Sequence, residues 1–130
     1  MKLLLDTSVI IDFLRRKDKE NSLLFNLSRE MFYISIVTHT ELYSGKSVWE
    51  KNEKKQALED VLDGITVLTL DNKISQTAGK IKAYHHTISF VDAIIAATAL
   101  DYNIPLVTLN TKDFESIEGL NLFQNSLVRN

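Results

Sequence analysis

The chain has 130 residues, enough for one domain, and its 45% hydrophobic and 25% charged residues exclude disorder and low complexity. It has no cysteine, which excludes disulfide scaffolds, thiolate zinc sites and cysteine nucleophiles. The net charge of −2 at pH 7, taken alone, argues against a nucleic-acid binder. Because no apolar stretch approaches the ~20 residues that span a bilayer, we expect one soluble, cytoplasmic domain over residues 1–130.

Short apolar strands alternate with longer helical stretches along the chain. The predicted strands are 2–5, 32–37, 65–70 and 105–109, followed by a short edge strand at 121–124. The predicted helices are 7–16, one from 38 to about 45, 49–63, one after the cap at Asp71, and 89–102, with helical spacing also at 18–30. This alternation predicts an α/β three-layer sandwich, with a mainly parallel central sheet of four to five strands flanked by helices.

Four acidic residues follow the predicted strands or open a helix. Asp6 directly follows the first strand, and Glu41 lies four residues after the second, in the first turn of the next helix. Asp113 lies four residues after the fourth strand, and Asp92 lies in the first turn of the apolar helix 89–102. Ligands of such sheets bind outside the carboxyl ends of the strands, so we expect these acids to converge there.

Each of these acids also has a simpler explanation as a helix cap. Segments 38–41 and 89–92 fit the capping box, and Asp6 and Asp113 could cap or complement the helices after them. Four converging carboxylates, however, are costly, since two charges about 4 Å apart repel by roughly 4 kcal/mol at an effective dielectric of 20. Mg²⁺ or Mn²⁺, which take oxygen ligands, would relieve that repulsion. Without cysteine or an HExxH pair, a zinc hydrolase is much less attractive.

Four segments carry a resemblance to a known family. They are 3–14 (LLLDTSVIIDFL), 40–42 (TEL), 89–100 (SFVDAIIAATAL) and 106–114 (LVTLNTKDF). In order and spacing they resemble the PIN domain, and most closely the VapC-type toxin ribonucleases of toxin–antitoxin pairs. The resemblance implies a PIN-like fold and an endoribonuclease with one or two Mg²⁺ or Mn²⁺ ions in an acidic pocket, cleaving RNA phosphodiester bonds through a metal-activated water. It also implies a cognate antitoxin and a homodimer.

The resemblance further implies a role for each residue of the pattern. The residues matching the catalytic acids are Asp6, Glu41, Asp92 and Asp113. Asp6, Asp92 and Glu41 would hold metal, while Asp113 matches a variable position that acts through water. Polar positions that would orient carboxylates or water are matched by Thr7, Ser8, Thr108 and Asn110.

Basic residues could steer RNA toward a pocket whose own acids repel phosphate. The candidates are Arg15, Arg16, Lys17 and Lys46, although charge runs are usually solvated faces. His85 and His86 could contact phosphate, but a solvated helix end explains them more simply. Setting the four pocket acids aside turns the net charge of −2 into +2, so the bulk charge averages an acidic site with a mildly basic remainder.

Other functions fit parts of the pattern. A phosphoacceptor receiver domain is also α/β with acids at strand exits, and Asp71 would be its acceptor. A receiver domain would require two adjacent acids after the first strand, whereas here Asp6 is followed by Thr7. A PIN-type nuclease of housekeeping RNA processing would carry the same acids, and an adjoining antitoxin reading frame would distinguish a toxin from it. A PIN-like module that binds RNA without cutting it would not need all four acids.

Overall fold

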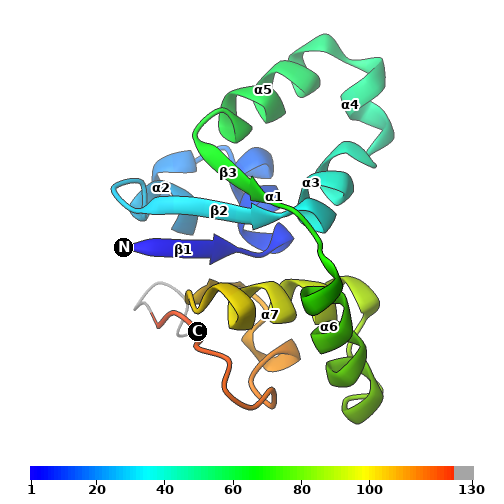
Figure 1. The fold of residues 1–130 in the computed structure, drawn as a ribbon. Helices are drawn as coiled ribbons and strands as arrows, with labels where there is room; N and C mark the ends of the chain where they lie inside the picture. Colours follow the sequence, from blue (N-terminus) through cyan, green and yellow to red (C-terminus); the bar gives the residue numbers. More distant parts are fainter. Residues whose placement is uncertain (125–130) are drawn as a thin grey trace.

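The computed structural model describes residues 1–124, and residues 125–130 of the predicted domain lie outside the described residues. Four strands form a parallel sheet in the order β3-β2-β1-β4 (Figure 1). The strands are β1 (Lys2–Leu5), β2 (Met31–Ser35), β3 (Ile65–Leu68) and β4 (Leu106–Val107). The predicted edge strand at 121–124 is reduced to one parallel bridge between Leu106 and Leu122.

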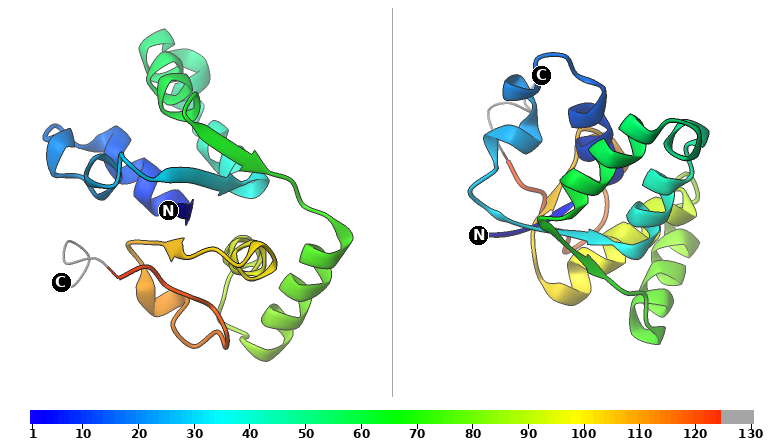
Figure 2. Two further views of the ribbon diagram at one scale, coloured as in Figure 1. Left: turned by 60° about the vertical axis from the view of Figure 1, so that its left-hand side comes forward. Right: turned by 90° about the horizontal axis from the view of Figure 1, so that it is seen from above.

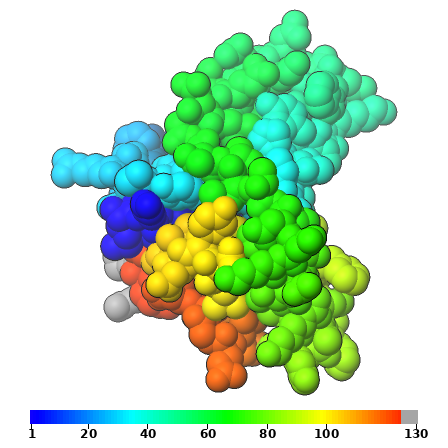
Figure 3. Space-filling model, in the orientation of Figure 1, coloured from blue at the N-terminus to red at the C-terminus, as the bar shows by residue number. Residues whose placement is uncertain are grey.

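Helices cover both faces of this sheet (Figures 1 and 2). They are α1 (Thr7–Arg15), α2 (Leu23–Asn26), α3 (Ile36–Tyr43), α4 (Lys46–Glu50), α5 (Asn52–Leu62), α6 (Asn72–Tyr84) and α7 (Phe90–Tyr102), with the short 3₁₀ turns η1 (Lys19–Asn21) and η2 (Thr111–Asp113). The α4–α5 pair and the α6–α7 layer lie at opposite ends of the molecule in the space-filling view (Figure 3). The predicted α/β three-layer sandwich is confirmed.

Strand β1 lies at the centre of the molecule and contributes to both hydrophobic cores. Successive side chains of a strand point to opposite faces of its sheet. Leu3 and Leu5 therefore pack with α1, α2 and α5, whereas Leu4 packs with α6 and α7, and all three are fully buried. Since β1 pairs with β2 on one side and β4 on the other, the strand order reverses at its carboxyl end, where ligands of such sheets bind.

The second predicted strand ends two residues early. The Ser35 hydroxyl accepts a hydrogen bond from the Val37 N–H (3.2 Å) and caps α3, so Ile36 and Val37 are helical despite their β-branched side chains. Thr38 consequently lies inside α3, and the predicted capping box at 38–41 is wrong. Glu41 lies in the second turn of α3, not in its first.

The predicted helix 49–63 is divided into α4 and α5. The Trp49 indole donates to the Tyr43 carbonyl (2.7 Å), and the two rings pack with centroids 5.8 Å apart. These contacts hold α4 against the end of α3, so the chain turns at Lys51, whose backbone is extended. The helical spacing at 18–30 likewise yields only η1 and α2, because the Ser22 hydroxyl starts a new helix.

The fourth strand is shorter than the predicted 105–109. It ends at Val107 because the next side chain, Thr108, hydrogen bonds to the carboxylate of Asp6 instead of continuing the ladder. Over residues 1–124, no helix combines the length and the apolar character needed to cross a membrane.

Candidate metal centre at the carboxyl ends of the strands

The carboxylate of Asp6 is buried, with 4% of the residue exposed, where β1 runs into α1. One oxygen accepts a hydrogen bond from the Ser8 N–H, which makes Asp6 the N-cap of α1. The other accepts a hydrogen bond from the Thr108 hydroxyl, just beyond β4. The cap explanation therefore accounts for one oxygen of Asp6, while the second is held between β1 and β4, where the strand order reverses.

Glu41 is joined to the start of α1 through a threonine hydroxyl. Thr7 donates to Glu41 Oε1 at 2.6 Å, and its oxygen lies 3.1 Å from the hydroxyl oxygen of Thr38. Both threonines are buried, whereas Glu41 is partly exposed. The contact fixes one Glu41 oxygen next to the element that begins at Asp6.

Asp92 is an acid of this site whose pKa is raised by its surroundings. It lies in the first turn of α7, where its N–H donates to the Ser89 hydroxyl (3.0 Å), so the predicted cap at Ser89 is present. Its own carboxyl group is half-buried, and burial together with the negative charges of Asp6, Asp113 and Glu41 raises its pKa from 3.8 to about 6. The fold thus brings Asp6, Asp113 and Glu41 within electrostatic reach of Asp92.

The fourth acid, Asp113, ends η2 and is exposed. Together with Asp92 it lines a cavity of about 270 Å³ beside the other acids. The segment leading to it is tied back to the site, because the Leu109 N–H donates to the Ser8 hydroxyl (3.1 Å) and the Asn110 N–H to the Thr108 hydroxyl (2.9 Å). The backbone of Asn110 thus takes part in this network, and the role of its side chain stays a prediction.

The chemistry of these residues fits a hard divalent cation. No three Asp, Glu or His side chains within residues 1–124 stand ready as ligands of one ion, and hydroxyl groups hold the oxygens of Asp6 and Glu41 instead. In the same part of the chain, none of the four acids has an ion-pair partner. Carboxylate oxygens without a cationic partner are the ligands that Mg²⁺ and Mn²⁺ prefer. Burial and the neighbouring negative charges raise the pKa of Asp92, and a bound ion would balance those charges.

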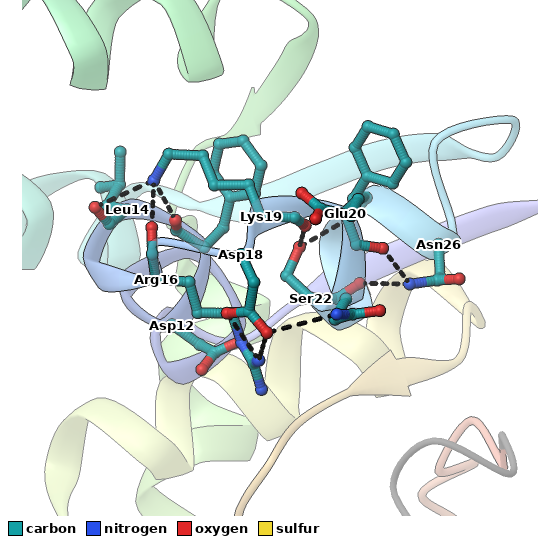
Figure 4. Close-up of polar contacts among 11 residues, drawn as sticks. Asp12, Leu14, Arg16, Asp18, Lys19, Glu20, Ser22 and Asn26 are labelled. Carbon is teal, nitrogen blue, oxygen red and sulfur yellow. Dashed lines mark hydrogen bonds and ion pairs between the residues drawn. The ribbon is translucent and has the colours of Figure 1, made fainter.

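The four basic residues predicted to bind RNA do not line the cavity beside Asp92. Arg16 is paired with Asp12 (2.9 Å) and Asp18 (3.4 Å), as Figure 4 shows, and Lys46 lies 4.0 Å from Glu50. Arg15 shares a groove with Glu41 but lies about 13 Å along the α1 axis from Asp6, and exposed Lys17 lies farther on.

Sequence reasoning did not single out one basic residue that does lie beside two of the acids. Lys112 lines the same cavity as Asp92 and Asp113. Its only signal in the sequence is its place directly before Asp113.

Comparison with known proteins identifies the family of this site. The sequence model of the PIN domain matches residues 3–120. The chain belongs to the PIN domain family. Among its relatives, a "Ribonuclease VapC" from Rickettsia bellii is 36% identical over 92% of this chain and 93% of the relative. A "tRNA(fMet)-specific endonuclease VapC" from Shigella flexneri is 30% identical over 92% of this chain and 95% of the relative.

Solved structures agree with this assignment. A DNA-bound VapBC from Salmonella typhimurium superposes with a TM-score of 0.80 at 25% identity, covering 95% of this chain and 97% of that one. VapBC-1 from nontypeable Haemophilus influenzae gives 0.76 at 26% identity, covering 95% and 98%. The prediction of a VapC-type PIN ribonuclease is confirmed at the level of the family.

The receiver-domain alternative is wrong. In that doubly wound order the third strand pairs with the first, whereas here β3 pairs with β2. Asp71, its candidate phosphoacceptor, caps α6 by accepting a hydrogen bond from the Ile74 N–H (2.8 Å). Asp71 is therefore the N-cap of α6, as the sequence analysis predicted.

Proposed function

We propose that this PIN-domain protein is a metal-dependent endoribonuclease of the cytoplasm and the toxin of a toxin–antitoxin pair. The observation that carries the proposal is the half-buried carboxyl group of Asp92, whose pKa is raised by burial and by the charges of Asp6, Asp113 and Glu41. A fold selected for stability alone would not collect these charges at one edge of a sheet. A site that binds a divalent cation requires them.

Asp6, Asp92 and Glu41 would hold one or two Mg²⁺ or Mn²⁺ ions, with Asp113 acting through water. A divalent ion bound there would stabilise negative charge on phosphate oxygens and lower the pKa of water for attack on the phosphodiester. The chain's own hydroxyls prepare this site, since Thr108 orients the carboxylate of Asp6 and Thr7 that of Glu41. Ser8 would assist by tying the segment after β4 to the start of α1.

The proposed partners are the RNA substrate, a cognate antitoxin protein and a second copy of the chain. The antitoxin is supported by a solved toxin–antitoxin complex from Klebsiella pneumoniae, in which a chain 27% identical to this one superposes with a TM-score of 0.71. Exposed apolar side chains that such proteins could cover include Phe25, Met31, Trp49, Tyr84 and Phe90.

The proposal is tested by cleavage of purified total tRNA with Mn²⁺ and with EDTA. We expect cleavage only with the metal, and at least about 100-fold slower cleavage by Asp6→Asn, because even outer-shell partners of a metal site are worth 10–100-fold. Asparagine caps a helix as well as aspartate does, so this substitution removes the charge and keeps the cap of α1.

Asp12→Asn is the matched control, because Asp12 lies on the same helix and its carboxylate pairs with Arg16. It should cleave like the wild type. Metal-independent cleavage, or full activity of Asp6→Asn, would overturn the proposed metal centre. An RNA-binding module without nuclease activity would bind the tRNA and leave it intact under every condition.

A further inference from the structure

A cavity beside Asp92 and Asp113 extends the acidic site, and most of its lining residues are not acids. It has a volume of about 270 Å³ and lies between the α6–α7 loop, the start of α7 and the segment around η2. Its polar lining comprises the acids Asp92 and Asp113 together with His85, Thr87, Ser89, Lys112 and Ser116. Because Asp92 belongs both to this cavity and to the acid cluster, a molecule held in the cavity would lie directly beside the proposed metal.

The walls of the cavity are fixed by hydrogen bonds. Lys82 Nζ donates to the carbonyl oxygens of His86 (2.9 Å) and Ile88 (2.6 Å), which holds the loop between α6 and α7. The His85 ring lies between two further carbonyl oxygens, with Nδ1 3.0 Å from that of Ile81 and Nε2 3.3 Å from that of Ser116. His85 thus ties α6 to the segment after η2, so the cavity is formed before any ligand arrives.

Lys112 is the cation of this cavity that remains available to an anion. Its side chain is exposed, and within residues 1–124 it forms no ion pair, not even with the neighbouring Asp113. The other basic group, His85, faces carbonyl oxygens instead. A phosphate approaching Asp92 and Asp113 would be repelled by both acids, and Lys112 supplies the opposite charge at the same place.

We propose that this cavity binds a backbone phosphate of the RNA, adjacent to the bond that is cut, with Lys112 as its cation. The inference rests on the proposed nuclease function and names the subsite that sets the position of the strand on the metal centre. The hydroxyls of Thr87 and Ser116 line the same space and can donate to phosphate or ribose oxygens. The volume lies just below the ~300–1,000 Å³ of small-molecule sites, which suits one sugar–phosphate unit better than a longer stretch of RNA.

The test compares Lys112→Gln with Lys2→Gln, which removes the same charge at the amino end of β1, the opposite edge of the sheet. The probe is total tRNA with Mn²⁺, and the readouts are KM, kcat, the salt dependence of KM and the Kd for Mn²⁺.

We expect Lys112→Gln to raise KM about tenfold, as for a lost hydrogen bond to a charged group, with kcat and the Mn²⁺ Kd changed less than about twofold. The slope of log KM against log salt should fall by about 0.7, the value for one lost contact to single-stranded nucleic acid. Lys112→Arg should restore most of the loss, and Lys2→Gln should match the wild type.

Each alternative outcome has its own meaning. If Lys112 only balances the charge of the acids, Lys112→Gln will tighten Mn²⁺ binding and leave KM and its salt slope unchanged, which overturns the subsite. If Lys112→Gln and Lys2→Gln raise KM equally, the effect is general charge steering, and the subsite is again overturned. Both results leave the nuclease proposal standing. A wild-type protein that cleaves no RNA with Mn²⁺ would defeat the nuclease proposal itself, and this inference with it.

Discussion

Charged side chains are arranged in opposite ways at the two ends of α1. At the C-terminal end, shown in Figure 4, charged side chains meet opposite charges or carbonyl oxygens. At the N-terminal end, Asp6 lies within electrostatic reach of Asp92, whose ionised form is also disfavoured by Asp113 and Glu41. One end has the arrangement that stability favours, and the other gathers like charges.

The C-terminal end is held by one lysine. Lys19 Nζ donates to the carbonyl oxygens of Phe13 (2.6 Å), Leu14 (3.2 Å) and Arg16 (3.0 Å), and it lies 4.8 Å from the centroid of the Phe13 ring. The last carbonyls of a helix lack partners within the helix, and a cation suits the negative end of its dipole. Lys19 therefore satisfies groups that the helix leaves unpaired.

Over the nine residues of α1, charged groups that are paired within the fold are thus separated from acids that we expect to serve a function. Arg16 and Asp12 form a partly exposed ion pair of the ordinary surface kind, which contributes at most about 1 kcal/mol to stability. The acids at the other end have no such partners within residues 1–124, and burial adds to the cost of ionising Asp92. The like-charged end is consequently where we expect chemistry.

Of the tests that bear on this comparison, Asp92→Asn should have the largest effect on cleavage; it removes one negative charge and keeps the shape of the side chain. Metal-dependent cleavage should fall at least about tenfold, because a ligand of the proposed ion is lost. The free energy of unfolding measured in EDTA should stay the same or rise, because carboxylate repulsion is relieved. A loss of stability with cleavage preserved would mean that Asp92 serves only to complement the dipole of α7.

A smaller effect is expected at the other end of the helix from Lys19→Met, which keeps most of the side-chain bulk. The free energy of unfolding should fall by about 1–2 kcal/mol, because three backbone carbonyls lose a charged donor. Urea denaturation measures this change, and cleavage by the folded fraction should not alter. Lys17→Met, at an exposed position of the same segment, is the control and should leave stability unchanged. Equal stabilities for the two variants would show that Lys19 does not hold the helix end.

A third prediction concerns pH in the absence of metal. Since the pKa of Asp92 is about 6 in the folded protein and 3.8 is its ordinary value, the folded state binds its proton more tightly between these pH values. The free energy of unfolding should therefore fall as pH rises from about 4 to 6, and this contribution should level off above about 7. Thermal unfolding in EDTA from pH 4 to 7.5 measures it against Asp92→Asn, in which this component should vanish. Parallel curves for the two proteins would contradict the electrostatic description of the cluster.

Sequence reasoning located the acids because strand ends are marked by local signals. Asp6 follows an unbroken apolar run, and Ser89 is a recognisable cap three residues before Asp92. The same reasoning failed at Ile36 and Val37, whose β-branched side chains suggest a strand, because the cap at Ser35 outweighs that preference. The single domain over 1–130 and the homodimer stay predictions.

The rest depends on contacts between distant segments, which no local pattern reveals. The cavity at Lys112 exists because His85 at the end of α6 approaches Ser116, 31 residues away. The contact of Thr108 with Asp6 spans 102 residues, and it explains why β4 ends at Val107. In both places, tertiary hydrogen bonds decide the geometry, and the sequence shows only the polar residues that make them.

The most direct test of the metal centre is the anomalous diffraction of a crystal soaked in Mn²⁺. The account predicts Mn²⁺ among Asp6, Glu41 and Asp92 at the N-terminal end of α1, and no Mn²⁺ at Asp12 and Asp18, which are both paired with Arg16. No Mn²⁺ at the cluster in crystals of a protein that cleaves RNA, or Mn²⁺ bound at Asp12 and Asp18 instead, would contradict it.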